Sequence, residues 1–326
     1  MDLWQLTDLC TPWCVHVVAT LRIADHLADG PMEFDKLAAI CGADAESLQR
    51  VLRHLVSKGL FEEPETGRFA LNDATQALRE ERTRMWLDLR GFGGRMAYAW
   101  GTLLSAVQTG RPAYHEAFRR SFWDDLDANP EIAASFDEGM GPAGHGIPDA
   151  NILINELDWP SVHTVADIGG GTGALLAEVL RARPHVHGTL VDLPRTVARS
   201  DALFQAAGVA DRVSVVGQSF FDPLPAGLDV YLLKSVMGDW PNREVVRILT
   251  RCAEAARPSG RVVILSGIVP GEVAGPELLM MVLVGGKDRT LDEFQPLARE
   301  AGLEVRASGS VASGRFVVEC RPVANW

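Results

Sequence analysis

The sequence has few of the features that mark membrane or secreted proteins. Its 326 residues contain no run approaching the roughly 18 uninterrupted apolar residues that a membrane-spanning helix needs. The N-terminal segment MDLWQLTDLC has no basic stretch ahead of an apolar run, so a secretory signal is not expected. These absences predict a cytoplasmic protein that does not bind a membrane.

Cysteine is also scarce, and its spacing carries no clear signal. The chain has five cysteines: Cys10, Cys14, Cys41, Cys252 and Cys320. They form no CxxC pair, and none stands with histidine at a familiar metal-ligand spacing. The sequence therefore predicts buried, reduced thiols and no metal site.

Basic residues are outnumbered by acidic ones. Lysine and arginine total 31 against 43 aspartates and glutamates, a formal net charge of −12. A surface of this sign repels phosphate backbones, which argues against a nucleic-acid partner.

The N-terminal third nevertheless has the pattern of a DNA-binding unit. Apolar residues recur at helical spacing over 11–29, 34–40 and 45–59, and Gly59 is a natural helix stop. Residues 61–71 then predict a hairpin, which completes a winged helix.

Two interpretations of this winged helix compete, DNA recognition and dimerisation. The second helix carries basic residues, but glutamates surround them: Glu46, Glu62, Glu63 and Glu65. The acidic surroundings favour a dimerisation module that does not bind DNA.

Residues 74–160 are mostly helical in pattern and rich in aromatics, which predicts helices packed around a flat cavity. Residues 139–148 contain four glycines and two prolines and cannot continue a helix. This loop is a candidate lid or pocket wall. Phe136 and Met140, at its start, are candidate substrate contacts.

From residue 162 the pattern changes to short apolar strands that alternate with helices. Strands are expected at 164–168, 188–192, 213–217, 228–233, 261–268, 303–307 and 316–320, and helices near 172–182, 194–207, 243–256 and 290–301. This alternation predicts a doubly wound, mainly parallel sheet. Because no helix separates the final pair, the last strand is expected to run antiparallel, unlike in an ordinary dinucleotide dehydrogenase.

The strongest local signal is the segment Val165–Ala174, a strand that enters a glycine loop and opens a helix. Gly169 and Gly171 also fit the dehydrogenase pattern, so the glycines alone are weak evidence. Asp167 precedes them, and a carboxylate there suits a cationic ammonium or sulfonium and repels a pyrophosphate. Asp192 ends the next strand, where a carboxylate can accept both hydroxyls of a ribose.

Two further strand ends carry polar or aromatic residues. Ser219 and Phe220 follow the third strand, where they could hydrogen-bond and cover an adenine. Lys234 closes the fourth strand and could reach a cofactor or a substrate oxygen.

At this point the chain resembles a known family over nearly its whole length. The matching motifs are TLRIADHL, LQRVLRHLVSKGLFEE, ADIGGGTG, LVDLP, SFFDPLP, LKSVMGDWPN and GGKDRTLDEF. They are similar to those of the small-molecule S-adenosylmethionine-dependent O-methyltransferases of plants and actinobacteria. The antibiotic-biosynthesis branch is the most similar, and its members commonly modify aromatic polyketides.

The resemblance implies an α/β fold: a Rossmann-like class I methyltransferase sheet with one antiparallel C-terminal strand, preceded by a mainly α winged-helix dimerisation domain. We expect a dimerisation domain at 1–100 and a catalytic domain at 101–326, with a helical substrate-pocket segment at 101–160. The family also implies S-adenosyl-L-methionine as cofactor, an entwined homodimer and a small aromatic substrate.

The resemblance also assigns site residues. The implied cofactor residues are Asp167, Gly169, Gly171, Asp192, Leu193, Ser219, Phe220 and Lys234. Asp239 and Trp240 match the family's Asp-Trp pair, which would either contact the substrate or orient a helix. The further candidate substrate residues are Phe136, Met140 and Met281.

One position departs from the family pattern. The histidine that removes the proton from the phenol is replaced here by Gly238. Methyl transfer could proceed by proximity alone, since a base typically contributes only about 10²–10⁴-fold. Another residue could serve as base, with His145 as the best candidate. Alternatively, the cofactor could support a non-methylating reaction such as hydroxylation, decarboxylation or ring-forming rearrangement. Methyl transfer is the favoured interpretation.

Glu277 is the second candidate catalytic residue. It matches the family's acidic residue near the reacting oxygen, but a carboxylate at a helix N-terminus would also favour the helix dipole. The sequence does not decide between these interpretations.

Overall fold

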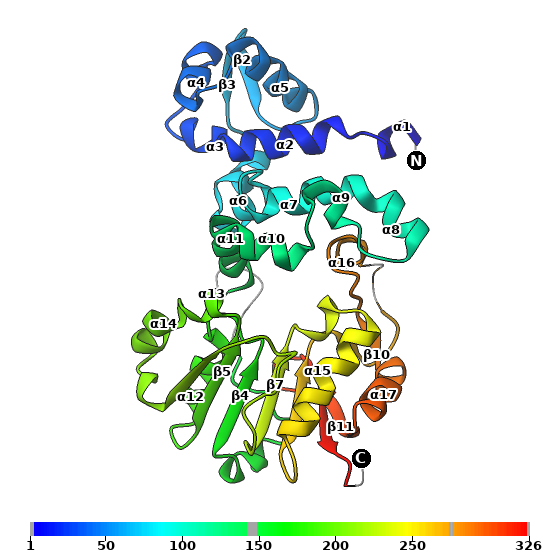
Figure 1. Ribbon diagram of the computed structural model, residues 1–326. Helices are drawn as coiled ribbons and strands as arrows, with labels where there is room; N and C mark the ends of the chain where they lie inside the picture. Colours follow the sequence, from blue (N-terminus) through cyan, green and yellow to red (C-terminus); the bar gives the residue numbers. More distant parts are fainter. Residues whose placement is uncertain (1–2, 142–148, 274, 276, 325–326) are drawn as a thin grey trace. The chain divides into compact units, whose positions relative to one another are not determined.

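The computed structural model describes residues 3–141, 149–273, 275 and 277–324. The chain divides into two compact units, the first comprising 1–98 with 130–139 and the second 99–129 with 140–326 (Figure 1). The two units are groups of residues in close contact, and neither is shown to fold by itself. The domain boundary expected at residue 100 therefore remains a prediction.

The first unit contains the predicted winged helix. Helices α4 (Phe34–Cys41) and α5 (Ala45–Ser57) are followed by the hairpin of β2 (Glu62–Glu65) and β3 (Arg68–Ala70). Strand β1 (Met32–Glu33) pairs with β3 and completes an antiparallel sheet of order β1-β3-β2. The apolar face of α5 supplies its share of the core through Leu48, Leu52 and Leu55.

The prediction of one continuous helix over 11–29 is wrong, because the structure has two helices there. Helices α2 (Cys10–Thr20) and α3 (Ile23–His26) are separated at Arg22, which has a left-handed φ of 56°. The break turns the chain so that Ile23 and Leu27 are both buried in the core. Helical spacing persists across the break, which is why periodicity does not reveal it.

Short helices make up most of the remaining N-terminal half. The first unit has α1 (Leu3–Leu6), α6 (Glu81–Leu87), α7 (Phe92–Ala99) and α11 (Pro130–Met140). The second unit has α8 (Leu103–Thr109), α9 (Tyr114–Phe118) and α10 (Phe122–Ala128). The buried Tyr114 hydroxyl donates to Asp125 at 2.8 Å and ties α9 to α10.

The expectation of buried thiols is wrong for the three N-terminal cysteines. Cys252 and Cys320 are buried, whereas Cys10 is exposed and Cys14 and Cys41 are partly exposed. Cys10 is the first residue of α2, and the buried part of that helix begins only at Val18.

The second unit is built on a seven-stranded sheet of order β11-β12-β8-β7-β4-β5-β6. The strands are β4 (Thr164–Ile168), β5 (His187–Asp192), β6 (Val213–Gly217), β7 (Val230–Lys234), β8 (Arg261–Leu265), β11 (Leu303–Ser310) and β12 (Phe316–Pro322). Strand β12 is antiparallel to both of its neighbours, β8 and β11, and the remaining pairings are parallel. The predicted sheet, with its antiparallel last strand, is confirmed.

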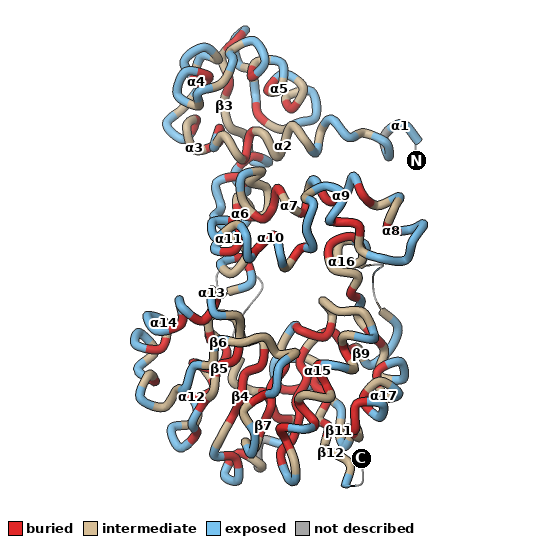
Figure 2. The backbone as a smooth tube through the Cα atoms, in the orientation of Figure 1, coloured by how far each residue is buried: buried red, intermediate tan, exposed pale blue. Residues whose placement is uncertain are grey.

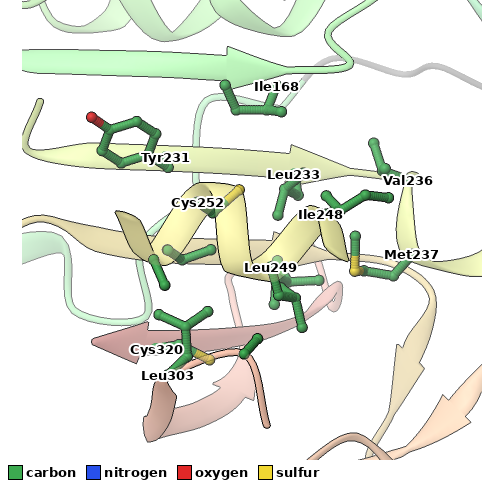
Figure 3. Packing of buried hydrophobic residues seen from close by; sticks show 14 of the residues in the cluster. Ile168, Tyr231, Leu233, Val236, Met237, Ile248, Leu249, Cys252, Leu303 and Cys320 are labelled. Atoms are coloured by element: carbon green, nitrogen blue, oxygen red, sulfur yellow. The ribbon is translucent and has the colours of Figure 1, made fainter. Parts of the chain in front are cut away.

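Side chains of the central strands alternate between two cores, as the twofold period of a strand requires. Ile168 and Leu233 face a cluster with α15 (Asn242–Ala255) and α17 (Leu291–Glu300), shown in Figure 3. Val165 and Leu232 face the opposite cluster with α12 (Ala174–Ala182) and α14 (Ser200–Ala207). The central strands are accordingly buried along their length (Figure 2).

Two predicted elements of this unit are interrupted. The helix expected at 194–207 consists of α13 (Pro194–Val197) and α14. The strand expected at 261–268 ends at Leu265, because Ser266 and Gly267 both have positive φ, 68° and 82°. The chain resumes as β9 (Ile268–Val269), which pairs in parallel with β10 (Arg289–Thr290). Within the described part of the chain, no helix is both long and apolar enough to cross a membrane.

Candidate active site

Four of the five parallel strands of the large sheet, β4 to β7, carry the predicted cofactor residues at or just after their carboxyl ends. Strand β4 pairs with β5 and β7 on either side, so that Asp167 lies opposite Leu190 and Leu232. The Gly169 amide donates to the Val191 carbonyl at 2.8 Å and continues the pairing into the loop. The carboxyl ends of the strands are where doubly wound sheets bind their ligands.

The glycine loop depends on having no side chains at two positions. Gly169 has a left-handed φ of 69°, and a Cβ there would lie 2.9 Å from Val236 Cγ2. A Cβ on Gly170 would lie 2.5 Å from the carboxyl carbon of Asp167. Both contacts are too short for carbon atoms, so the loop can pack over Asp167 only as glycine.

Asp167 is the most unusual side chain of the site. It is 1% exposed, and its carboxylate oxygens have no hydrogen-bond partner among the described residues. Burial, and secondarily the charge of Asp192, raises the pKa of Asp167 to about 7, while Lys234 opposes the shift. An unpartnered buried carboxylate is costly. The resemblance implies S-adenosylmethionine, whose amino and sulfonium groups are cationic, and this site fits such a group.

Asp192 holds the glycine loop against the end of β5. Its Oδ2 accepts from the Gly171 amide at 2.8 Å, and its Oδ1 accepts from the Leu193 amide at 2.7 Å. Burial raises the pKa of Asp192. A carboxylate offers about four lone-pair positions, so two remain for ligand hydroxyls.

Lys234 and Ser219 complete the polar part of the site. Lys234 is half-buried at the end of β7, and burial is the main cause that lowers its pKa. The Ser219 hydroxyl accepts from the Phe221 amide at 3.2 Å and so shapes the turn after β6.

An aromatic cluster lies beside the glycine loop. Phe220 is close to Gly169, since a Cβ on that glycine would approach the Phe220 ring at 3.3 Å. The Trp240 ring meets Phe220 edge-on, with centroids 5.9 Å apart, and stacks on Trp123 at 5.7 Å and 17°. Flat, apolar faces of this kind suit aromatic ligands.

Gly238 faces a carboxylate that the sequence analysis did not select. A Cβ on Gly238 would lie 3.2 Å from Asp288 Oδ1, so Asp288 approaches the space that a side chain at 238 would enter. The neighbouring Asp239 has its pKa raised to about 7 by burial and by the charge of Asp288. The structure therefore places the Asp288 carboxylate beside the position of the missing histidine, with Asp239 close enough for its pKa to respond to the charge of Asp288.

Glu277 supports this carboxylate pair. It precedes α16 (Leu278–Leu283) in a left-handed conformation, and its side chain makes no capping bond to that helix. Instead its Oε2 accepts from the Asp288 amide. Burial and the proximity of Asp288 raise the pKa of Glu277.

Arg289, also missed by the sequence analysis, fixes the loop that carries Gly238 and Asp239. Its side chain is fully buried. It donates to the carbonyls of Met237 at 2.8 Å, Trp240 at 2.6 Å and Lys287 at 2.9 Å, and to Asn242 Oδ1 at 2.9 Å. The motif GGKDRT could have indicated this residue, because it places adjacent opposite charges after two glycines.

The remaining predicted site residues are on other elements or outside the described chain. Phe136 belongs to the first unit and packs edge-on against Phe92, with centroids 5.9 Å apart. Met140 is 38% exposed, and Met281 is partly buried on α16. His145 lies outside the described residues.

Comparison with protein families matches residues 100–304 to the O-methyltransferase domain and residues 4–80 to the O-methyltransferase dimerisation domain. Among curated proteins, the chain is 40% identical to 2,7-dihydroxy-5-methyl-1-naphthoate 7-O-methyltransferase of Streptomyces carzinostaticus, with 96% of this chain and 95% of that protein covered. It is 37% identical to aclacinomycin 10-hydroxylase of Streptomyces purpurascens, with 94% and 85% covered.

A solved structure is equally similar. It is an O-methyltransferase from neocarzinostatin biosynthesis, in complex with S-adenosylmethionine and 2-hydroxy-5-methyl naphthoic acid. The TM-score is 0.90 at 39% identity, with 99% of each chain covered.

Proposed function

Because the chain belongs to the S-adenosylmethionine-dependent O-methyltransferase family, we propose that it methylates a phenolic hydroxyl of a fused-ring aromatic molecule of the naphthoate or polyketide class. The main support is the similarity over nearly the whole chain to a naphthoate O-methyltransferase and to a structure that holds a naphthoic acid. The aromatic cluster of Phe220, Trp123 and Trp240 is consistent with such an acceptor.

When bound, S-adenosylmethionine supplies a methyl group on a sulfonium that a phenolate oxygen can attack. In our proposal Asp167 accepts the cationic part of the cofactor, because its oxygens are buried and have no partner among the described residues. Asp192 accepts the ribose hydroxyls with the lone pairs that Gly171 and Leu193 leave free. Phe220 covers the adenine.

We further propose that Asp239 and Asp288 accept the proton of the phenol in place of the absent histidine. A carboxyl group whose pKa lies near 7 is matched to accept a proton at neutral pH. Asp288 Oδ1 lies 3.2 Å from the point that the Cβ of a side chain at position 238 would occupy. Glu277 holds the Asp288 backbone and acts as a positioning residue.

The test of the overall reaction is the mass of the products. Purified protein is incubated with S-adenosylmethionine and a panel of hydroxynaphthoic acids and larger phenolic polyketides. We expect one acceptor to gain a methyl group, with S-adenosylhomocysteine formed in equal amount. Because one relative is a hydroxylase, the products are also examined for the mass of an added oxygen atom. A product that gains oxygen without a methyl group would favour the non-methylating alternative.

A first prediction concerns the cofactor. Replacing Asp192 with alanine removes charge-assisted hydrogen bonds, so affinity for S-adenosylhomocysteine should fall by about 1.5–3 kcal/mol, or about 10- to 150-fold. Isothermal titration calorimetry measures this loss, and NAD should give no binding heat. Asp201→Ala, on the exposed face of α14, is the matched control and should bind normally. Equal affinity in the two variants would contradict the assignment of Asp192.

A second prediction concerns assembly. We propose a homodimer formed through the dimerisation domain, whose N-terminal segment exposes large apolar side chains, with Trp4 80% and Leu9 75% exposed. Light scattering should give twice the chain mass, and Trp4→Glu should shift the protein toward monomer by placing a charge in the interface. Glu81→Lys, on the exposed start of α6, controls for a change of surface charge. A wild-type monomer, or a salt-sensitive DNA gel shift, would contradict the proposal.

A further inference from the structure

The winged-helix unit brings together potential metal ligands that the sequence separates. Cys10 and Cys14 are one helical turn apart on α2, and His54 comes from α5. The sulfur atoms of Cys10 and Cys14 and a ring nitrogen of His54 all lie within 4.8 Å of one another. No residue of this cluster belongs to the candidate active site.

The spacing of the two sulfurs matches a tetrahedral metal site. Cys10 Sγ and Cys14 Sγ are 3.8 Å apart. Zinc binds cysteine sulfur at roughly 2.3 Å, and a tetrahedral angle then separates two ligating sulfurs by about 3.8 Å. The two sulfurs therefore already have the spacing of ligands to one ion, and the His54 ring nitrogen lies within 4.8 Å of both.

The chemistry of the donors selects the kind of ion. Two thiolates and an imidazole are soft to borderline ligands, which prefer zinc over the hard cations magnesium and calcium. We propose that Cys10, Cys14 and His54 bind one zinc ion, with a water molecule as the fourth ligand. The exposed side chain of Cys10 leaves the site open to entry and to that water.

The surroundings already orient the ligands. The Asp8 carboxylate accepts from the Cys10 amide at 2.9 Å and from the Thr11 hydroxyl at 2.6 Å, and it pairs with Lys58 on the α5 side. His54 Nε2 lies 2.8 Å from Thr11 Oγ1, within hydrogen-bond distance. If His54 binds the ion through Nδ1, this hydrogen bond is kept. If it binds through Nε2, the metal bond replaces it. Partners of this kind hold metal ligands in place.

Binding would add a bond between α2 and α5, two helices that otherwise meet through side-chain packing and the Thr11–His54 hydrogen bond. An ion that binds the folded unit and not the unfolded chain stabilises the fold by mass action. The expected consequence is structural and independent of methyl transfer.

The experiment uses the full chain in a phosphine reductant and cobalt(II) as the spectroscopic probe. We expect one cobalt per chain, with the visible bands of tetrahedral cobalt and a near-ultraviolet sulfur-to-cobalt band, both removed by zinc. Zinc should also raise the thermal midpoint. Cys10→Ser and His54→Gln should weaken zinc binding by more than the roughly 10- to 100-fold typical of losing an outer-shell partner.

Two matched variants separate ligation from general thiol or imidazole binding. Cys41→Ser and His26→Gln alter residues of the same unit that lie outside the cluster, and both should bind cobalt as the wild type does. Because Cys10 is exposed, Cys10→Ser should melt like the wild type when no metal is added. The proposal is overturned by a wild-type spectrum without a sulfur-to-cobalt band, or by a band that survives Cys10→Ser.

Discussion

Replacing Asp288 with asparagine should lower the rate of methyl transfer by about 100-fold or more and leave cofactor affinity unchanged. The variant keeps the size of the side chain but removes the carboxylate beside the position of the missing histidine. Loss of a general base costs about 10²–10⁴-fold. Single-turnover rates with an acceptor of ordinary phenol acidity measure the loss.

The pH dependence distinguishes this proposal from catalysis by proximity alone. A carboxyl group accepts a proton only in its ionised form, and Asp239 has its pKa raised to about 7. The wild-type rate should therefore rise as pH increases through about 7. In Asp288→Asn the like charge that helps to raise this pKa is gone, so the remaining activity should rise at lower pH.

The control for Asp288 is Asp292→Asn, an exposed carboxylate in the first turn of α17, which should react like the wild type. If proximity alone suffices, Asp288→Asn stays within a few-fold of the wild type and the rate follows the pKa of each phenol. A hundredfold loss in His145→Ala, with normal cofactor binding, would instead identify that histidine as the base.

Replacing Arg289 with methionine should lower the free energy of unfolding by about 3–5 kcal/mol. Methionine fills similar space, but it leaves three backbone carbonyls and the Asn242 side chain without their donor in a buried setting. Each buried acceptor that loses its partner costs about 1–3 kcal/mol, part of which relaxation recovers. Urea denaturation followed by circular dichroism measures the change.

The exposed Arg299 on α17, the helix that follows β10, provides the comparison for Arg289. Arg299→Met should change the unfolding free energy by less than about 0.5 kcal/mol, as surface substitutions usually do. If Arg289→Met proves equally mild, the buried guanidinium does not fix the loop at 237–240. A destabilised but folded Arg289→Met should also transfer methyl groups slowly, because that loop carries Asp239.

The sheet and its glycine loop could be predicted from the sequence because their signals are local. Each strand is a short apolar run, and the missing helix before β12 indicates its reversed direction. Asp167 and Asp192 were found because strand ends share one edge of a parallel sheet, so sequence position translates directly into spatial proximity.

Features that depend on a single backbone angle or on distant residues could not be predicted this way. The breaks at Arg22 and Ser266 use left-handed conformations in residues that usually avoid them, and the apolar periodicity continues across the first. Asp288 approaches Gly238 only because β9 and β10 pair and bring two loops together. Cys10 and His54 meet only after two helices have packed.

The raised pKa of the buried Asp167 carboxyl group makes both the stability of the fold and cofactor binding depend on pH. Its pKa of about 7 lies above the ordinary value of 3.8, so the folded chain holds a proton that the unfolded chain releases. This group therefore contributes stability at low pH, and the contribution is lost as pH rises from about 4 to about 7.

A cationic cofactor beside Asp167 reverses that preference, because it favours the ionised carboxylate. Below pH 7, binding should then expel a proton into the buffer, and affinity should increase with pH until it levels off above about 7. The binding heat should depend on the ionisation enthalpy of the buffer at pH 6 and hardly at pH 8.5. Below pH 7, cofactor binding would thus be coupled to the release of a proton from Asp167.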